Sequence, residues 1–291
     1  MIHPNLVELA LRFRDKSNEI EQFLPNVQIF ERRTVSNVEA TVYTPVICLI
    51  LQGAKETKIG DQSVQLTAGD ALLVSHDLPV TSTITRASLA APYLALILSL
   101  DVALMRSLYD HLAGRLRDTG ETRALSADPA DPAWVTPLMR YLSLMNDPLD
   151  AQVLGPQILK EIHYRLMRAP IGGMLRNLLA ADSPASRIAR AISKIRAEFR
   201  TSVTISELAR AAGMSASSFH EHFKFVTGTT PLQYLKDLRL IEARSLLQSG
   251  GQSVSAAGFS VGYESPTHFS RDYARKFGTA PSRDSRAVTP A

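Results

Sequence analysis

The spacing of hydrophobic residues changes along the chain and divides it into regions. Between residues 27 and 100, short runs rich in Val, Ile, Leu and Thr are separated by turn residues such as Gly53, Gly60 and Gly69. Many short strands at nearly even spacing are typical of a β-sandwich or a small barrel. The predicted strands are residues 46–51, 55–59, 63–66, 71–74, 80–85 and 93–100.

From residue 101 the apolar residues recur every three or four positions, which indicates amphipathic helices. The same spacing, mixed with charged residues, occurs near the start at Leu6, Leu9 and Phe13. Three later stripes are Leu104, Leu108 and Leu112; Trp134, Leu138, Tyr141, Leu142 and Met145; and Leu154, Ile158, Ile162 and Leu166. The small and polar segment 180–186 follows, and it predicts a boundary between domains of residues 1–182 and 183–291.

The last third of the chain contains one pattern twice. Phe219, Phe223, Gly228 and Pro231 are followed 50 positions later by Phe269, Tyr273, Gly278 and Pro281. Where the first copy has Ala209, the second has Gly258, and glycine inside a helix costs roughly 0.5–1 kcal/mol relative to alanine. The second copy is therefore expected to be the less stable, and Gly258→Ala to stabilise it if the added methyl group fits.

Each copy predicts two helices joined by a tight turn. Gly213 and Gly262 mark the turns, because glycine adopts a left-handed backbone at little cost, and Ser215 and Ser265 follow as N-caps. The two copies span about residues 205–228 and 254–278. A single αα-hairpin of this kind is common in helical proteins, but two copies joined by a helical stretch favour tandem helix-turn-helix motifs that read DNA.

These residues carry a resemblance to a known family. The runs 207–215, 218–224 and 261–271 resemble the DNA-binding domain of AraC/XylS-type transcriptional regulators over about residues 185 to 285. Upstream, the runs 43–45, 48–53, 68–70 and 92–95 resemble the sensor domain of one AraC-type subgroup.

The resemblance implies a two-domain α+β fold, with a cupin-like β-barrel or jelly roll followed by helices and then an all-α domain with two helix-turn-helix motifs. It also implies a sequence-specific transcription activator of promoter DNA that contacts RNA polymerase, is controlled by a small-molecule effector in the barrel, and can form a homodimer.

The distribution of charge agrees with a DNA-binding C-terminal region. Residues 183–291 contain 15 Lys and Arg against 8 Asp and Glu, whereas residues 1–182 contain 17 against 20. A basic domain attracts phosphates, and the mildly acidic remainder does not. The start of the chain lacks the basic and continuous apolar segments of a signal peptide, and the longest apolar runs are too short to cross a bilayer. We therefore expect a cytoplasmic protein without a membrane partner.

The second helix of each motif presents polar residues opposite its apolar pair. Arg271 is the strongest candidate to read a base, because its planar fork can bond guanine O6 and N7 together. Glu221 is awkward near phosphates, so a solvated surface role is as plausible for it as a base contact. The predicted DNA-binding residues are Ser217, His220, Glu221, Lys224, Pro266, Thr267, Ser270, Arg271 and Arg275.

The predicted barrel offers few chemically active groups. Its single histidine, His76, has no His-x-His partner, so we expect no metal site, no other cofactor and no enzymatic activity, although a metal-dependent cupin enzyme remains an alternative. A second alternative function is that of an architectural DNA-binding protein. Cys48, the chain's single cysteine, lies in an apolar run where a thiol is inert, and an electrophile sensor is the minority interpretation. The candidate effector-binding residues are Tyr43, Cys48, Gln52, His76 and Tyr93.

Overall fold

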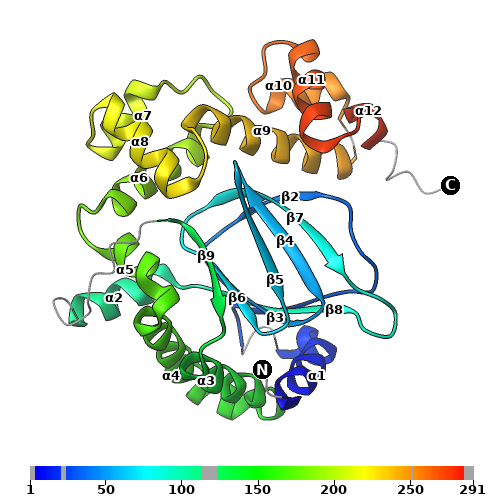
Figure 1. Ribbon diagram of the computed structural model, residues 1–291, viewed down its shortest axis with the longest axis vertical. Helices are drawn as coiled ribbons and strands as arrows, with labels where there is room; N and C mark the ends of the chain where they lie inside the picture. The colour runs from blue at the N-terminus through cyan, green and yellow to red at the C-terminus, as the bar shows by residue number, and fades with distance from the viewer. Residues whose placement is uncertain (1–3, 21–23, 113–122, 251, 285–291) are drawn as a thin grey trace.

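Two antiparallel sheets form the centre of the N-terminal region in the computed structural model, which describes residues 4–20, 24–112, 123–250 and 252–284 (Figure 1). The first sheet has the order β1-β8-β3-β6-β9 and the second the order β2-β7-β4-β5. Their bounds are β1 Val27–Arg32, β2 Glu39–Tyr43, β3 Val46–Gln52, β4 Ala54–Ile59, β5 Gln62–Thr67, β6 Asp70–Val74, β7 Leu78–Arg86, β8 Tyr93–Ser99 and β9 Leu125–Pro129.

The central strand β3 is apolar at nearly every position because both of its faces are covered. Val46, Cys48 and Ile50 join the cluster between the two sheets, whereas Ile47 and Leu49 join the cluster on the other face. A strand that is buried on both sides reads as a continuous hydrophobic run. The N-terminal helix and the helices that follow β8 supply the second cover.

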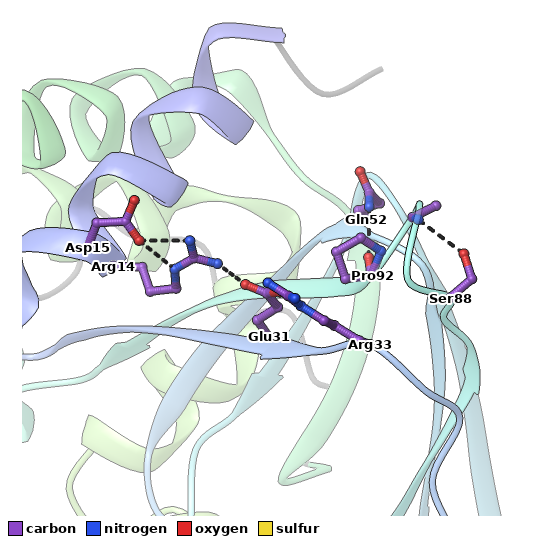
Figure 2. Close-up of polar contacts among 8 residues, drawn as sticks. Arg14, Asp15, Glu31, Arg33, Gln52, Ser88 and Pro92 are labelled. Carbon is purple, nitrogen blue, oxygen red and sulfur yellow. Dashed lines mark hydrogen bonds and ion pairs between the residues drawn. The ribbon is translucent and has the colours of Figure 1, made fainter.

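Those helices pack on the outer face of the first sheet (Figure 1). Arg14 of the first helix also pairs with Glu31 of β1, as Figure 2 shows. The sandwich is larger than the sequence predicts, because β9 pairs with β6 from beyond the expected range of residues 27–100. The elements are α1 Pro4–Ile20, α2 Val102–Leu112, α3 Pro132–Ser143, η1 Leu144–Asn146, α4 Pro148–Arg168, η2 Pro170–Gly172 and α5 Gly173–Leu179.

The C-terminal region is helical throughout its described residues. Its long helix α9 runs across the top of the sandwich, with α7 and α8 at one end and α10 and α11 at the other (Figure 1). The predicted two-domain α+β fold with two helix-turn-helix motifs is confirmed. The elements are α6 Pro184–Glu198, α7 Ile205–Ala212, α8 Ala216–Thr227, α9 Pro231–Gln248, α10 Val254–Ser260, α11 Pro266–Phe277 and α12 Pro281–Asp284.

The helical region is held against the sandwich by polar and apolar contacts. The Tyr234 hydroxyl on α9 donates to the backbone oxygen of Asp77 at 2.6 Å, and the Asp77 carboxylate pairs with Arg196 of α6 at 3.1 Å. The backbone N–H of Ala124 donates to the oxygen of Val226 at the end of α8. One apolar cluster continues from the interior of the sandwich into the first helix-turn-helix motif.

Candidate functional site

The first motif is built by capping and turn residues at the expected positions. Thr204 and Glu207 form a reciprocal capping box at the start of α7, which satisfies two backbone N–H groups. Gly213 ends α7 with φ 65°, and the Ser215 side chain accepts from the third residue of α8. The Phe219 and Phe223 rings lie fully buried. The remaining face of α8 is thereby directed outward.

The second motif repeats this construction with a closer approach between its helices. Ser265 caps α11, Pro266 occupies the first helical position, and Gly262 has φ 88°. Phe269 packs so near to α10 that a Cβ atom at Gly258 would lie 3.0 Å from its ring. This motif has its own small apolar cluster, which is separate from the cluster shared by the sandwich and the first motif.

The polar residues predicted to contact DNA lie on the outward faces of α8 and α11. Arg271 and Lys224 are exposed, and neither forms an ion pair with the described residues. Arg275 is exposed too, but it pairs at 2.8 Å with the nearly buried carboxylate of Asp272. The remaining predicted residues are exposed at Ser217, His220, Glu221 and Thr267 and half-buried at Pro266 and Ser270.

Arg239 of α9 fixes the second motif in a way that the sequence does not reveal. Its guanidinium donates to the backbone oxygens of Phe199 at 2.6 Å, Thr201 at 2.7 Å and Gly262 at 3.0 Å. One side chain therefore joins α9 to the end of α6 and to the turn between α10 and α11. A lone arginine in an amphipathic helix gives no signal of this role, because its partners are backbone atoms distant in sequence.

A cavity of about 540 Å³ opens between the sheets and α9. Three of the candidate effector-binding residues line it, namely Tyr43, Cys48 and Tyr93. The sequence did not point to Lys55, Ser82, Arg244 or Gln248, which line it as well. The complete lining is Phe30, Arg32, Ser36, Glu39, Ala40, Thr41, Tyr43, Cys48, Lys55, Ser82, Ile84, Tyr93, Ala95, Ile97, Arg244 and Gln248.

Lys55 is the unusual residue of this cavity, because its side chain is only 6% exposed. The Nζ atom lies 3.4 Å from the Tyr43 hydroxyl and 3.5 Å from the Cys48 sulfur. Burial by itself lowers the pKa of Lys55, but attraction to Cys48, Tyr43 and Tyr93 outweighs burial and raises that pKa. The lysine is thus a buried cation, and no carboxylate of the described residues pairs with it.

The other two candidate effector-binding residues, Gln52 and His76, do not line the cavity. Gln52 turns toward the loop before β8, where its amide donates to the backbone oxygen of Pro92 at 2.8 Å (Figure 2). His76 is buried at the junction with α6, between Ser75 at 2.8 Å and the backbone oxygen of Ala185 at 3.0 Å. Both of its ring nitrogens are occupied, and burial lowers its pKa to about 4.

The described part of the chain contains no cluster of three or more His, Cys, Asp or Glu side chains placed to hold a metal ion. Within the same residues, no helix is both long and apolar enough to cross a membrane.

Two family models match the chain, and together they cover most of it. The model of the AraC-type transcriptional regulator N-terminus matches residues 23–174, and that of a helix-turn-helix domain matches residues 208–287. The first match includes both sheets and helices α2 to α4 but not α1. The second includes α8 to α12 and most of α7.

Two curated relatives match part of the chain. The transcriptional activator RhaS of Escherichia fergusonii is 34% identical over 96 residues, which are 33% of this chain and 34% of that protein. The transcriptional regulator CdhR of Pseudomonas aeruginosa is 29% identical over 163 residues, 51% of this chain and 45% of that protein. The chain thus spans about a third to a half of the length of these relatives.

The solved structure of ToxT from Vibrio cholerae, described as bound to an unsaturated fatty acid, has a similar fold. It is 13% identical, covers 90% of this chain and 95% of its own, and has a TM-score of 0.55. A second ToxT structure, described as bound to (E)-4-(8-methylnaphthalen-1-yl)but-3-enoic acid, has a TM-score of 0.54 at 13% identity and covers 91% of this chain and 100% of its own. At this identity the likeness establishes the fold alone.

Proposed function

Because the chain belongs to the family of AraC-type transcriptional regulators, we propose that it binds promoter DNA through its two helix-turn-helix motifs and that a small molecule in the sandwich cavity controls this binding. In this proposal, residues 1–182 form the sensor domain and residues 183–291 form the DNA-binding domain. The proposed role is one of binding, in keeping with relatives that regulate transcription, and it involves no catalysis.

The observation that carries DNA binding is the repeated reading helix. α8 and α11 each bury an aromatic pair and direct polar residues outward, and the single helix α9 joins the two motifs. If the reading helices enter successive major grooves on one face of DNA, roughly 34 Å apart, one chain covers two half-sites. Two modest contacts that are linked in this way act at high effective concentration.

Selection of bound fragments from a random DNA pool tests this role directly. We expect the full chain to enrich a two-part sequence whose halves are about one helical turn apart. Enrichment of bent or A·T-rich DNA without a defined sequence would favour an architectural role instead, and no enrichment at all would contradict DNA reading.

The cavity supports control by a small organic molecule. Its volume lies within the range of ligand pockets, and it combines apolar walls with a few polar groups. The ToxT structures, which share this fold, are described as bound to a fatty acid and to a substituted butenoic acid, and both are small organic molecules. A ligand changes DNA affinity only as far as it binds the DNA-binding state and the non-binding state of the protein with different affinities. A tenfold change in DNA affinity therefore requires a difference of about 1.4 kcal/mol between the ligand's two binding free energies.

Cys48 offers a second way for a ligand to act, because its sulfur is on the cavity wall beside Lys55. A screen of metabolites and simple aldehydes against the wild type and Cys48→Ser distinguishes covalent reaction with Cys48 from noncovalent binding in the cavity. A response to electrophiles that disappears in Cys48→Ser, with basal DNA binding intact, would establish covalent sensing. An unchanged response identifies the signal as noncovalent.

The same role implies further partners and a place in the cell. We propose that the chain activates transcription through RNA polymerase, functions in the cytoplasm with the DNA, and can pair as a homodimer. Sedimentation with and without DNA tests the dimer, and transcription from the selected site with purified polymerase tests activation.

A further inference from the structure

The cavity contains a buried positive charge that lacks an acidic partner among the described residues. Lys55 contacts the phenols of Tyr43 and Tyr93 and the thiol of Cys48, and these groups are poor substitutes for a carboxylate. Buried charges in proteins are normally paired, because removal of an ammonium from water is unfavourable. The chain also places Lys58 on the same strand, where it is exposed and paired with Glu56 at 3.0 Å. The missing counter-charge is therefore specific to the cavity.

The opposite wall of the cavity carries a second cation, whose partner lies in α12, directly after the second helix-turn-helix motif. Arg244 of α9 lines the cavity, and its Nε atom is 3.0 Å from the Asp284 carboxylate of α12. The Nε hydrogen does not point at that oxygen, so the contact is an ion pair without a hydrogen bond. The guanidinium also lies 4.6 Å from the ring centre of Phe277, the last residue of α11.

Asp284 is in turn part of the support of the second reading helix. Its carboxylate accepts from the Tyr273 hydroxyl at 2.8 Å, and the Tyr273 and Phe277 rings are 4.5 Å apart. Arg244 thus connects the cavity wall with the end of α11, because it contacts both Phe277 and Asp284. An anion in the cavity would compete with Asp284 for this arginine.

We propose that the cavity binds a small organic carboxylate, held by Lys55 on the sheet side and by Arg244 on the α9 side, and that this binding releases Asp284 and loosens the second helix-turn-helix motif. The inference rests on the proposed function, since it specifies the ligand and the path of its signal. A carboxylate supplies the charge that Lys55 lacks, and bidentate pairing suits the guanidinium of Arg244. DNA binding must then restore the order of α11 and α12, so the ligand weakens binding to a two-part site.

Thermal unfolding of the full chain tests the ligand class. The probes are butyrate, hexanoate, octanoate and phenylpropionate, each compared with its matched alcohol. We expect at least one carboxylate to raise Tm saturably while its alcohol does not, Lys55→Met to abolish the shift, and Lys58→Met to retain it. The proposal is overturned if no carboxylate raises Tm, if the alcohols act equally, or if the shift survives in Lys55→Met.

DNA affinity with and without the active carboxylate tests the path. We expect a fall of about tenfold, equivalent to about 1.4 kcal/mol, for the two-part site and no change for the half-site read by α8 alone. Asp284→Asn keeps an acceptor for the Tyr273 hydroxyl but loses the ion pair with Arg244. Without ligand, this variant should already have the lower DNA affinity of the ligand-bound wild type, and the carboxylate should not lower that affinity further. A full response in Asp284→Asn would refute the competition.

The two proposals fail separately. If the chain selects a DNA sequence but no carboxylate raises Tm, the ligand inference is wrong and the regulator remains. If carboxylates bind through Lys55 but no DNA sequence is selected, the regulatory function is wrong and the binding site remains.

Discussion

Individual side chains on the two reading helices should differ in what they contribute to DNA binding. Arg271 is exposed in the second turn of α11, and the first two turns of a reading helix face base edges, whereas Lys224 is in the third turn of α8. We expect Arg271→Ala to cost about 1–3 kcal/mol and to relax preference at one base position. Lys224→Ala should weaken all sequences alike and lower the salt slope by about one unit. Binding selections at two salt concentrations measure both; a uniform loss in Arg271→Ala would assign that residue to phosphate binding.

His76 makes stability depend on pH. Burial lowers its pKa to about 4 in the folded chain, below the ordinary 6.5, against the opposing effect of its bond to Ala185. The folded state therefore binds the proton less readily than the unfolded state. The stabilisation is complete above about pH 6.5 and is lost as pH falls toward 4, by about 3 kcal/mol in total.

His76→Gln removes this titration, so its unfolding free energy should change less between pH 7 and pH 5 than that of the wild type. Denaturant unfolding at several pH values measures the difference. Part of the dependence should persist, because burial also lowers the pKa of His163. Identical pH profiles of the variant and the wild type would show that His76 is not held neutral.

At the scale of elements, the close contact between α10 and α11 reverses an expectation drawn from helix propensity. A methyl group at Gly258 would press on the Phe269 ring at 3.0 Å, and the backbones cannot separate without disturbing the small cluster around that ring. Overpacking costs typically 1–3 kcal/mol, more than the roughly 0.5–1 kcal/mol that alanine gains. We expect Gly258→Ala to destabilise the second motif by about 1 kcal/mol, measured by amide exchange. Faster exchange in α10 and α11 but not in α7 supports this, and slower exchange contradicts it.

Helices and strands with a strong hydrophobic pattern could be predicted from the sequence, whereas strands that mix polar and apolar residues could not. β3 and β8 are long apolar runs, and the repeat identifies α7, α8, α10 and α11 with their caps. β2 and β9 are edge strands with alternating polar residues, so neither stands out. Of the cavity lining, the sequence predicted only Tyr43, Cys48 and Tyr93, because a lysine such as Lys55 in an alternating strand resembles a surface residue. Nothing in the pattern of α9 reveals that Arg244 faces the sandwich.

The whole molecule is divided less sharply than its linker suggests. The proposed boundary lies between α5 and α6, yet the apolar cluster of the sandwich includes Ile188 of α6 and Tyr234 of α9. We expect residues 183–291 alone to fold and to select the same DNA sequence, because both motifs and α9 lie within them. Their Tm should be lower than that of the full chain, since the sandwich no longer covers these residues.

Circular dichroism and DNA selection on the fragment check this expectation. Tyr234→Phe in the full chain is a matched control, because it removes only the hydrogen bond to Asp77. An unfolded fragment would mean that the sandwich and the first motif form one folding unit.

The uninterrupted course of α9 also limits how this protein can change in evolution. Each residue of an α-helix adds about 1.5 Å and turns the chain by about 100°. A single insertion or deletion between Tyr234 and Gln248 would therefore rotate α11 away from the side of the DNA that α8 faces, whereas a gain of seven residues would nearly restore the phase. Substitutions on the reading helices can alter which bases are preferred one at a time. The spacing of the two halves of the operator, in contrast, is tied to the number of residues in one helix, so promoters and regulator must keep that spacing together.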